Sequence, residues 1–504
     1  MMSDALIKRI LQAKVYDVAI ESPLDAARLL SKRLKNSVWI KREDQQSVFS
    51  FKLRGAYNKI ANLPEAVRAK GVICASAGNH AQGVALAARE LGIRGTIVMP
   101  QTTPDIKVNA VKALGGHVVL HGDSYDEAFS HAQSLIADKG YAFVHPFDDL
   151  DVIAGQGTIG MEILRQHKGQ PDVVFLPVGG GGLLAGVSAY IKFVSPNTRV
   201  VAVEAADSAC FAAAMKAGKR VTLDHVGLFA DGVAVKQIGK HTFDIARHCV
   251  DEVITCSTDE MCAAIKDLFD EYRCIAEPSG ALALAGLKKY VEATGCKGQS
   301  LVAIHSGANM NFDRLRHIAE RTELGERKEA VLAVTIPEKP GSFKAFCQAL
   351  GKRSVTEFNY RYSNNGDAHV FVGISLRGGL SERTELVEQL QRKGYAVTDL
   401  SDDEMAILHT RHLVGGHAGL ADEKLFRFIF PERPGALMNF LTRLGGDWNI
   451  SLFHYRNHGS AYGRVLVGLQ LADKPLKALL KTLDGVGYEY QDESDNPAYH
   501  LFMR

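Results

Sequence analysis

The sequence predicts an α/β protein, with a front part built on parallel β-strands and two small α+β modules behind it. Two observations support this prediction. Up to about residue 320, short runs of β-branched residues alternate with longer helical patterns. Beyond that point, one segment of the chain occurs twice. At 504 residues, the chain is long enough for two or three domains.

Short runs rich in β-branched residues are expected to form the buried parallel strands of the front part. These runs are residues 71–75, 95–99, 116–120, 173–176, 199–203 and 301–304. Helical patterns lie between them, among them residues 81–91 and 259–272. When parallel strands are joined by crossover helices, ligands gather at the carboxyl ends of the strands. Functional residues are therefore expected directly after these runs.

The tail of the chain repeats itself. The segment AVTIPEKPG (residues 333–341) recurs 94 positions later as RFIFPERPG (residues 427–435). Each copy reads as a strand, a Pro-Gly turn, a helix, two strands, a second helix and a last strand, which is the pattern of a ferredoxin-like split βαβ unit. We expect the two modules at residues 330–410 and 422–504, and such a pair behind a larger domain indicates a regulatory role.

Charge and cysteine content restrict the classes of ligand. Basic and acidic residues nearly cancel, at 59 against 57, and leave a net charge of +2 with no large excess to attract nucleic acid or an anionic membrane. No uncharged apolar run reaches membrane-spanning length. The eight cysteines are scattered without a C-x-x-C pair, which favours reduced thiols over disulfides or a zinc site. We expect a cytoplasmic protein that binds small molecules and no metal.

Lys52 is the candidate for a reactive amine. It stands in the segment SFKLRGA (residues 50–56), next to the aromatic ring of Phe51. Burial beside such a ring lowers an amine's pKa, so that its nucleophilic form exists near neutral pH. A lysine at a strand-to-helix junction is more often a solvated surface charge. Arg54 would either neutralise a phosphate or pair with an acid, and pairing is favoured.

Four consecutive glycines strengthen the case for Lys52. Gly179, Gly180, Gly181 and Gly182, followed by Leu183, come directly after the predicted strand 173–176. An ordinary turn needs one or two glycines, and each further one increases the loss of backbone entropy on folding. A loop without side chains lets backbone N–H groups surround an anion. An amine and an anion cradle together indicate a phosphorylated aldehyde cofactor.

Two further segments follow predicted strands. Ser76, Gly78, Asn79 and His80 open the helix 81–91, where free N–H groups bind carboxylate or phosphate; helix capping by Ser76 or Asn79 is the alternative. His80 taken alone is more often a packed histidine. Ser306 follows the strand 301–304 and could present its hydroxyl to a ring nitrogen, although read alone it is a serine in a turn.

In this order, the motifs Ser-Phe-Lys-x-Arg-Gly, Ser-x-Gly-Asn-His, the tetraglycine loop and Ser-Gly-x-Asn resemble those of fold-type II pyridoxal-phosphate enzymes of the serine/threonine dehydratase family. The resemblance covers about residues 1–325 and implies a catalytic domain of two parallel-sheet subdomains, the smaller one, about residues 41–145, being inserted. The tail resembles the ACT-like modules of biosynthetic members. The resemblance of the whole chain implies conversion of L-threonine to 2-oxobutanoate and ammonia, the first step of isoleucine biosynthesis. It also implies inhibition by isoleucine, a valine effect that opposes this inhibition, and a homotetramer.

The same resemblance implies roles for individual residues. Lys52 would hold pyridoxal 5'-phosphate as a Schiff base, Phe51 would pack beside its ring, Asn79 would bind its phenolic oxygen, Ser306 would face its ring nitrogen, and Gly179, Gly180, Gly181, Gly182 and Leu183 would bind its phosphate. Ser76, Gly78, Asn79 and His80 would hold the substrate carboxylate. Ala77 stands where racemases have a second serine, which disfavours racemisation.

Two alternatives stay open. One is a serine dehydratase or another fold-type II eliminating or replacing enzyme; threonine synthases and cystathionine β-synthases usually have Lys-Asp-Arg where this chain has Lys52-Leu53-Arg54. The other is an amino-acid sensor with an inactive catalytic scaffold. In the repeated modules, the candidates for effector contacts are Tyr360, Arg361, Tyr455 and Arg456, although such residues on a strand face are more often ordinary packing.

Overall fold

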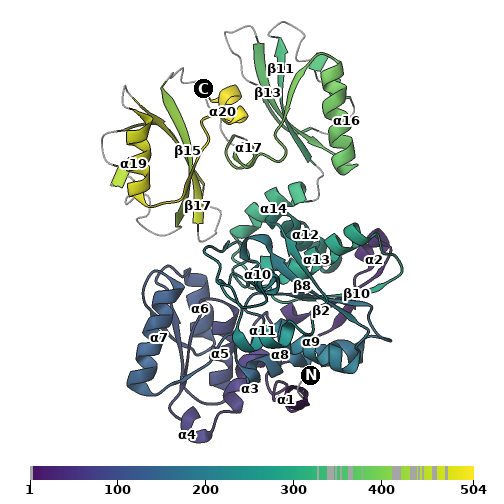
Figure 1. Cartoon of the computed structure of the whole chain (residues 1–504), viewed down its shortest axis with the longest axis vertical. Helices are drawn as coiled ribbons and strands as arrows, with labels where there is room; N and C mark the ends of the chain where they lie inside the picture. Colours follow the sequence, from purple (N-terminus) through teal and green to yellow (C-terminus); the bar gives the residue numbers. More distant parts are fainter. Residues whose placement is uncertain are drawn as a thin grey trace. The chain divides into compact units, whose positions relative to one another are not determined.

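The structure is a computed structural model. It describes residues 4–325, 329–337, 345–346, 349–351, 353, 355–360, 367–376, 378–410, 422–431, 440, 443–444, 448–456, 462–471 and 475–503. The chain divides into two compact units, Met1–Phe312 and Asp313–Arg504 (Figure 1). Helix α14 (Arg314–Gly325) opens the second unit, and the domain end expected at residue 325 is the end of this helix.

A six-stranded sheet forms the centre of the larger subdomain in the first unit. Its strands are β1 (Leu24–Ala26), β2 (Ser37–Arg42), β7 (Val173–Pro177), β8 (Arg199–Ala205), β9 (Glu252–Cys256) and β10 (Ser300–His305), in the order β1-β2-β10-β7-β8-β9. All pairs are parallel except β1 with β2. The predicted strands at β7, β8 and β10 are confirmed. Strands β1, β2 and β9 were not among the predictions, because charged residues interrupt or flank their short apolar runs.

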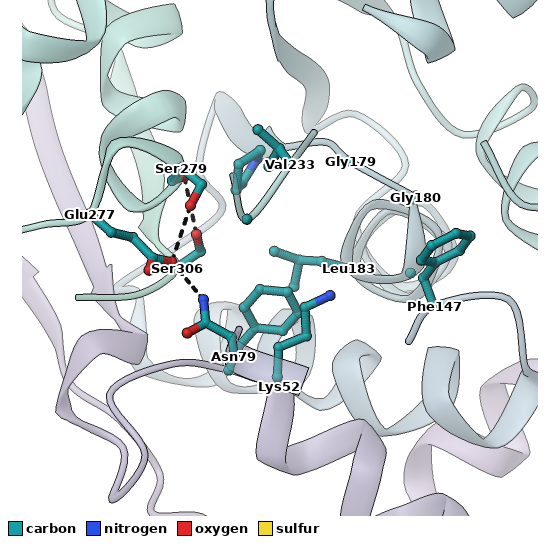
Figure 2. Close-up of a pocket in the computed structure, with 15 residues that line it drawn as sticks. Lys52, Asn79, Phe147, Gly179, Gly180, Leu183, Val233, Glu277, Ser279 and Ser306 are labelled. Atoms are coloured by element: carbon teal, nitrogen blue, oxygen red, sulfur yellow. Dashed lines mark hydrogen bonds between the residues drawn. The ribbon is translucent and has the colours of Figure 1, made fainter. Parts of the chain in front are cut away.

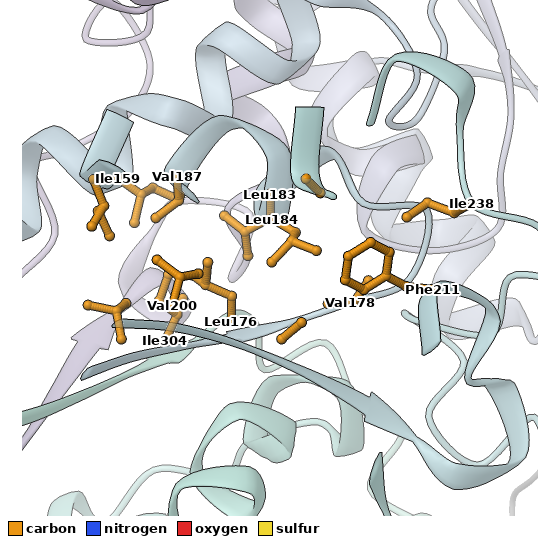
Figure 3. Close-up of a cluster of buried hydrophobic side chains, with 14 of the residues drawn as sticks. Ile159, Leu176, Val178, Leu183, Leu184, Val187, Val200, Phe211, Ile238 and Ile304 are labelled. Carbon is orange, nitrogen blue, oxygen red and sulfur yellow. The ribbon is translucent and has the colours of Figure 1, made fainter. Parts of the chain in front are cut away.

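One buried core joins this sheet to the helices α8 (Leu150–Gln166) and α9 (Gly182–Val194), as Figure 3 shows. Leu176 and Val178 enter the core from the end of β7, and Leu183 and Leu184 enter it from the first turn of α9. The glycine loop between them is therefore anchored on both sides by buried side chains. The sheet fixes the position of the loop, and the loop itself needs no side chains to hold it.

A smaller parallel sheet forms the second subdomain of this unit. Its strands are β3 (Val72–Ala75), β4 (Gly95–Met99), β5 (His117–Leu120) and β6 (Ala142–Phe143), in the order β5-β4-β3-β6. The predicted strands at β3, β4 and β5 are confirmed. Helices α3 (Lys52–Ala61) and α5 (Asn79–Glu90) pack in its core through small residues such as Ala56, Ala81 and Ala85.

The first unit contains further helices besides α3, α5, α8 and α9. They are α1 (Asp4–Leu11), α2 (Arg28–Leu34), α4 (Glu65–Arg68), α6 (Asp105–Ala113), α7 (Tyr125–Lys139), α10 (Cys210–Ala217), α11 (Lys240–Ala246), α12 (Thr258–Tyr272) and α13 (Pro278–Thr294), with 3-10 turns η1 (Glu43–Gln45) and η2 (Ala206–Ser208). The predicted helices 81–91 and 259–272 correspond to α5 and α12. Within the described residues, no helix has the length and apolarity needed to cross a membrane.

The second unit contains two antiparallel sheets of the same topology. Their strands are β11 (Glu329–Pro337), β12 (Val355–Tyr360), β13 (Asp367–Ser375) and β14 (Ala396–Asp399) in one copy, and β15 (Glu423–Pro431), β16 (Asn449–Arg456), β17 (Tyr462–Gln470) and β18 (Tyr490–Asp492) in the other. The orders are β12-β13-β11-β14 and β16-β17-β15-β18. The register shifts at Val355/Glu357 in one copy and at Ile450/Leu452 in the other. The same irregularity therefore occurs at equivalent positions of both copies, which supports the predicted repeat.

The helix before the last strand is α16 (Gly379–Arg392) in one copy and α19 (Leu476–Val486) in the other. The predicted Pro-Gly turns lie outside the described residues. After its last strand, each copy has a further short helix, α17 (Glu404–Leu408) or α20 (Pro497–Phe502), which was not predicted. Residues of both helices share a buried cluster with strands of both sheets, so that these helices join the two modules into one unit.

Candidate active site

One pocket in the first unit gathers most of the predicted site residues. It is lined by Phe51, Lys52, Asn79, Phe147, Pro177, Gly179, Gly180, Gly181, Gly182, Leu183, Gly232, Val233, Glu277, Ser279 and Ser306. It encloses an empty volume of about 430 Å³, open solvent included, within the range of sites for small ligands. In Figure 2 the glycine loop lies opposite the group formed by Glu277, Ser279 and Ser306, and Lys52 enters between them.

Lys52 is the first residue of α3, and its side chain points into this pocket (Figure 2). The amine donates to the main-chain oxygen of Pro146 at 3.4 Å and lies 5.2 Å from the centroid of the Phe51 ring. Burial lowers the pKa of Lys52 to about 8, while the negative charge of Glu277 acts in the opposite direction. At pH 7 about a tenth of the amine is therefore unprotonated, far more than for a solvated lysine.

The backbone N–H groups of the glycine loop are turned toward the pocket ligand site, and its carbonyl oxygens toward the protein. Its carbonyl oxygens are used elsewhere, since Gly179 accepts from the Cys210 thiol, and Gly180 accepts from Thr242 and from the backbone N–H of Gly239. Within the described residues, the N–H groups of the four glycines donate to no protein atom. They surround the amino terminus of α9, where an anion is favoured by the helix dipole.

The glycines are also required by close neighbours. A Cβ on Gly180 would lie 2.2 Å from the Phe147 ring, and one on Gly179 would lie 2.9 Å from Cα of Val233. Gly181 adopts a φ of 90°, in the left-handed region that favours glycine. The orphaned N–H groups, the amine and the hydroxyl of Ser306 together fit a phosphorylated pyridoxal cofactor.

Asn79 is the first residue of α5, and its amide is held at both ends. Its Nδ2 donates to Oε1 of Glu277 at 2.7 Å, and its Oδ1 accepts from Nδ2 of Asn309 at 2.7 Å. The second hydrogen of Nδ2 has no acceptor among the described residues. This hydrogen remains available to a pocket ligand, which is compatible with the expected contact to the cofactor's phenolic oxygen.

Ser306 follows β10 and is buried in the pocket wall. Its hydroxyl donates to the main-chain oxygen of Ser279 at 3.2 Å. A hydroxyl can rotate to another partner and can also accept a hydrogen bond. Ser306 therefore offers a neutral hydroxyl to a pocket ligand, and its contact with a ring nitrogen stays a prediction.

In the segment that leads from β3 into α5, Ser76 and Gly78 form a turn, whereas the His80 side chain is buried elsewhere. The hydroxyl of Ser76 accepts from the N–H of Gly78 at 3.3 Å, so this turn shapes the amino terminus of α5. The His80 side chain is buried away from the pocket and donates through Nε2 to the Val144 main-chain oxygen at 2.9 Å. If residue 80 contacts a substrate carboxylate, it does so through its main-chain N–H.

Arg54 pairs with acids, as favoured in the sequence analysis. Its guanidinium donates to Glu43 and to Glu162, with the shortest contacts at 2.8 and 2.6 Å. Lys41 adds a contact to Glu162 at 2.6 Å, and all four side chains are fully buried. This buried network ties α3, and with it Lys52, to the larger subdomain.

Sequence reasoning missed Glu277 and Ser279, which lie at the start of α13. Both are buried in the pocket wall, and burial raises the pKa of Glu277 to about 7, with a smaller contribution from Asp231. The segment Glu277-Pro278-Ser279 is an ordinary helix start with proline at the first position. No local pattern distinguishes such a carboxylate from a solvated one.

One cluster resembles a metal site in composition. Ligand atoms of Asp44, Cys274 and His305 lie within 4.8 Å of one another. Both carboxylate oxygens of Asp44 already accept from Arg42, at 2.9 and 2.8 Å. Asp44 therefore pairs with the Arg42 guanidinium, and Nδ1 of His305 also lies 3.1 Å from its Oδ1.

The effector candidates lie in the second unit. Tyr360 ends β12 and pairs with Val370 in the sheet, and Tyr455 and Arg456 lie in β16. Arg361 lies outside the described residues. The two tyrosines hold equivalent strand positions in the repeat, and their effector role stays a prediction.

Known protein families match both units of the chain. A family model described as "Pyridoxal-phosphate dependent enzyme" matches residues 15–307, and one described as "C-terminal regulatory domain of Threonine dehydratase" matches residues 320–410 and 414–503. The biosynthetic L-threonine dehydratase of Burkholderia multivorans is 55% identical over the full length of both chains. That of Escherichia coli is 53% identical, over 99% of this chain and 96% of its own.

Among solved structures, the processed form of threonine deaminase isoform 2 from Solanum lycopersicum is similar to this chain with a TM-score of 0.62 and 52% identity. It covers 63% of this chain and 94% of its own. The pocket, the repeated regulatory modules and these full-length relatives lead to one conclusion. This chain belongs to the biosynthetic threonine dehydratases, a family of pyridoxal-phosphate dependent lyases.

Proposed function

We propose that this protein converts L-threonine to 2-oxobutanoate and ammonia as the first step of isoleucine biosynthesis. The observation that carries the proposal is the pocket in which the Lys52 amine faces the N–H groups of the glycine loop. Relatives named L-threonine dehydratase support threonine as the substrate. In the reaction, the α-proton and the β-hydroxyl leave together as water, and a water molecule is taken up again when ammonia is released.

Bound pyridoxal phosphate supplies an electron sink for the negative charge that develops at the α-carbon of the amino acid. Lys52 holds this cofactor and, once its amine is free, takes the α-proton. A pKa of about 8 suits this task, because the amine is both available as a base and able to keep the proton afterwards. The ring of Phe51 keeps water from the amine.

The remaining residues bind and orient. The N–H groups of the glycine loop hold the phosphate, and the second amide hydrogen of Asn79 meets the phenolic oxygen. The turn formed by Ser76 and Gly78 at the amino terminus of α5 receives the substrate carboxylate. Ser306 faces the ring nitrogen with a neutral hydroxyl, which favours prompt elimination because it does not hold a proton there as a carboxylate would.

The repeated modules bind the effectors in this proposal. Isoleucine inhibits the enzyme through the second unit, and valine opposes it. Cooperative inhibition requires linked subunits, and we propose a homotetramer. Light scattering of the purified protein tests the oligomer, and a monomer that is still inhibited cooperatively would contradict this part.

Conversion is tested by recording the absorbance spectrum before and after L-threonine is added, with an assay for 2-oxobutanoate. L-Serine and D-serine serve as parallel substrates, and isoleucine with or without valine follows. A threonine-dependent change of spectrum with 2-oxobutanoate formed faster than pyruvate is expected. Faster release of pyruvate from L-serine would favour a serine dehydratase, and no product from either amino acid would favour a sensor.

Lys52→Ala is expected to abolish turnover and the visible absorbance of the bound cofactor, because no other amine occurs among the described residues that line the pocket. The circular dichroism spectrum should stay that of the parent protein, since Lys52 takes part in none of the buried ion pairs. An active variant with an unchanged visible spectrum would refute the assignment.

A further inference from the structure

Glu277 is a buried carboxylate in the active site to which no role has been assigned so far. It lines the pocket with Lys52 and Asn79, and no ion pair of Glu277 occurs within the described residues. Its Oε1 accepts from Asn79 at 2.7 Å and from the Ser279 hydroxyl at 3.1 Å. Burying a carboxylate without a cation is unfavourable, so a function should compensate for it.

A chain of hydrogen bonds gives the Asn79 amide one orientation, and Glu277 ends that chain. The main-chain oxygen of Val48 can only accept, so it binds the Nδ2 group of Asn309 at 2.7 Å. That Nδ2 group also donates to Oδ1 of Asn79 at 2.7 Å. The Nδ2 group of Asn79 must then face Glu277 and the pocket. An amide turned the other way would bring its oxygen against the carboxylate.

Glycine residues make room for this carboxylate. A Cβ on Gly307 would lie 2.6 Å from Oε1 of Glu277, and the backbone N–H of Glu277 donates to the main-chain oxygen of Gly307 at 3.2 Å. The carboxylate therefore sits against the segment that carries Ser306. Its side chain makes no capping bond to α13, so its hydrogen bonds serve the pocket and not the helix.

The charges around Glu277 come from three elements. Lys52 at the start of α3 lines the same pocket, and the carboxylate raises the pKa of that amine. Asp231, in the loop beside Gly232, repels it, while Lys107 on α6 pairs with Asp231 at 2.6 Å and attracts it. Above neutral pH, the carboxylate therefore keeps a negative charge in the pocket that Lys52 also lines.

We propose that Glu277 is a positioning residue of this active site, which holds the Asn79 amide with its N–H groups toward the cofactor and brings a negative charge into the pocket that Lys52 also lines. The proposal deepens the proposed function and rests on its assignment of Asn79 to the phenolic oxygen. Its two parts predict different behaviour for two variants. Glu277→Gln keeps an oxygen that accepts from Asn79 and loses the charge, whereas Glu277→Ala loses both.

The first experiment measures the dissociation constant of pyridoxal phosphate by equilibrium dialysis. It should stay within about twofold of the parent in Glu277→Gln and rise about fivefold to tenfold in Glu277→Ala, the effect of one lost hydrogen bond. In an Asn79→Ala background, Glu277→Ala should add little, because Glu277 acts through Asn79. Additive effects of the two substitutions would overturn the positioning role.

The second experiment follows the visible absorbance of the bound cofactor as a function of pH. The titration midpoint of the Lys52 nitrogen should move to lower pH in both Glu277 variants, since a negative charge favours the protonated form. The control is Glu252→Gln, a Glu-to-Gln change in an exposed pair with Arg199, which should leave the midpoint unchanged. An unmoved midpoint in Glu277→Gln would overturn the charge role.

Neither measurement needs turnover. If the parent protein binds pyridoxal phosphate and forms no 2-oxobutanoate from L-threonine, the proposed function fails while both predictions about Glu277 can still be met. Thermal unfolding of each variant shows whether a change in cofactor binding follows from loss of the fold. If Glu277→Ala is unfolded, the test rests on Glu277→Gln, which keeps the shape of the side chain.

Discussion

At the scale of single residues, the environment of each charged group decides what it does. Arg54 and Lys52 are two positions apart in the sequence, yet one makes fully buried ion pairs and the other faces a pocket. The guanidinium finds two carboxylates, Glu43 and Glu162, which hold its pKa above its usual range despite burial. The amine of Lys52 donates to the main-chain oxygen of Pro146 and makes no ion pair within the described residues, so burial lowers its pKa. Structural and chemical roles therefore separate within one turn of helix.

Glu162→Gln is expected to destabilise the first unit by about 3–5 kcal/mol, because it leaves the buried cations Arg54 and Lys41 short of one negative charge. The midpoint of urea unfolding, followed by circular dichroism, measures the loss. Glu21→Gln, in an exposed pair with Arg165, is the matched control and should change stability by less than about 1 kcal/mol. Equal midpoints for the two variants would contradict the prediction.

His80 should make the protein sensitive to acid. Burial lowers the pKa of His80 to about 3, whereas an unfolded histidine has a pKa of about 6.5. Between these values the unfolded chain binds a proton that the folded protein does not, so stability falls as pH decreases, by up to about 1.4 kcal/mol per unit. In His80→Gln, the decrease in thermal unfolding midpoint from pH 7.5 to 5 should be smaller. The same decrease in both proteins would count against a neutral, buried His80.

At the scale of elements, the active site is built from the segments that follow the carboxyl ends of strands. Asn79 follows β3, the glycine loop follows β7, and Ser306 follows β10. Each strand is buried and parallel to its neighbour, so three segments far apart in the sequence end at one pocket. The helix starts at α5, α9 and α13 then add free N–H groups or short polar side chains.

The two subdomains of the first unit are also joined beside the pocket. Lys107 on α6 contacts Asp231 at 2.6 Å, next to Gly232 and Val233 in the pocket wall. Asp231→Asn is expected to raise KM for L-threonine about twofold to fivefold and to leave the thermal midpoint within about 1 °C, because a partly exposed pair contributes little to stability. Lys107→Gln should have the same effect on KM, and the double variant should add nothing. An unchanged KM in both would show that this contact does not shape the pocket.

At the scale of the whole molecule, the two units differ in how they are built. The first has two sheets that are parallel except for the edge strand β1, with a pocket at their strand ends, and the second has two antiparallel sheets joined by α17 and α20. The two copies in the second unit also share a side-chain hydrogen bond that follows the last strand of each sheet. Ser401 accepts from the N–H of Val331 in one copy, and Ser494 accepts from the N–H of Leu425 in the other. Asn496, which caps α20, also donates to Asp403, which caps α17, at 3.2 Å.

Truncation after residue 325 is expected to leave threonine dehydration intact and to remove the response to isoleucine. The described residues that line the pocket all belong to the first unit, and the family model for the pyridoxal-phosphate dependent part ends at residue 307. Rates with and without isoleucine, measured on the full chain and on the truncated one, test this. Inhibition that persists after truncation would place the effector site in the first unit.

Much of the pocket follows from local patterns. Lys52 beside Phe51, the four glycines, Asn79 and Ser306 were all predicted, and all of them line the pocket. Each leaves a short-range signal, such as an amine next to a ring, a loop without side chains or a polar residue directly after a strand. Strand β2 was missed because Lys41 and Arg42 at its end read as surface charges. Both prove to be buried and paired in the fold.

The sequence by itself determined the chemical groups, the strand and helix periodicities and the repeat, because these depend on neighbours only a few positions apart. The tertiary structure alone decided which polar groups meet. Asn79 and Glu277 are 198 positions apart, and Arg54 and Glu162 are 108 apart. The pKa values of Lys52, His80 and Glu277 depend on how much water and which charges surround them. This environment of burial and neighbouring charges forms only when distant segments of the chain pack together.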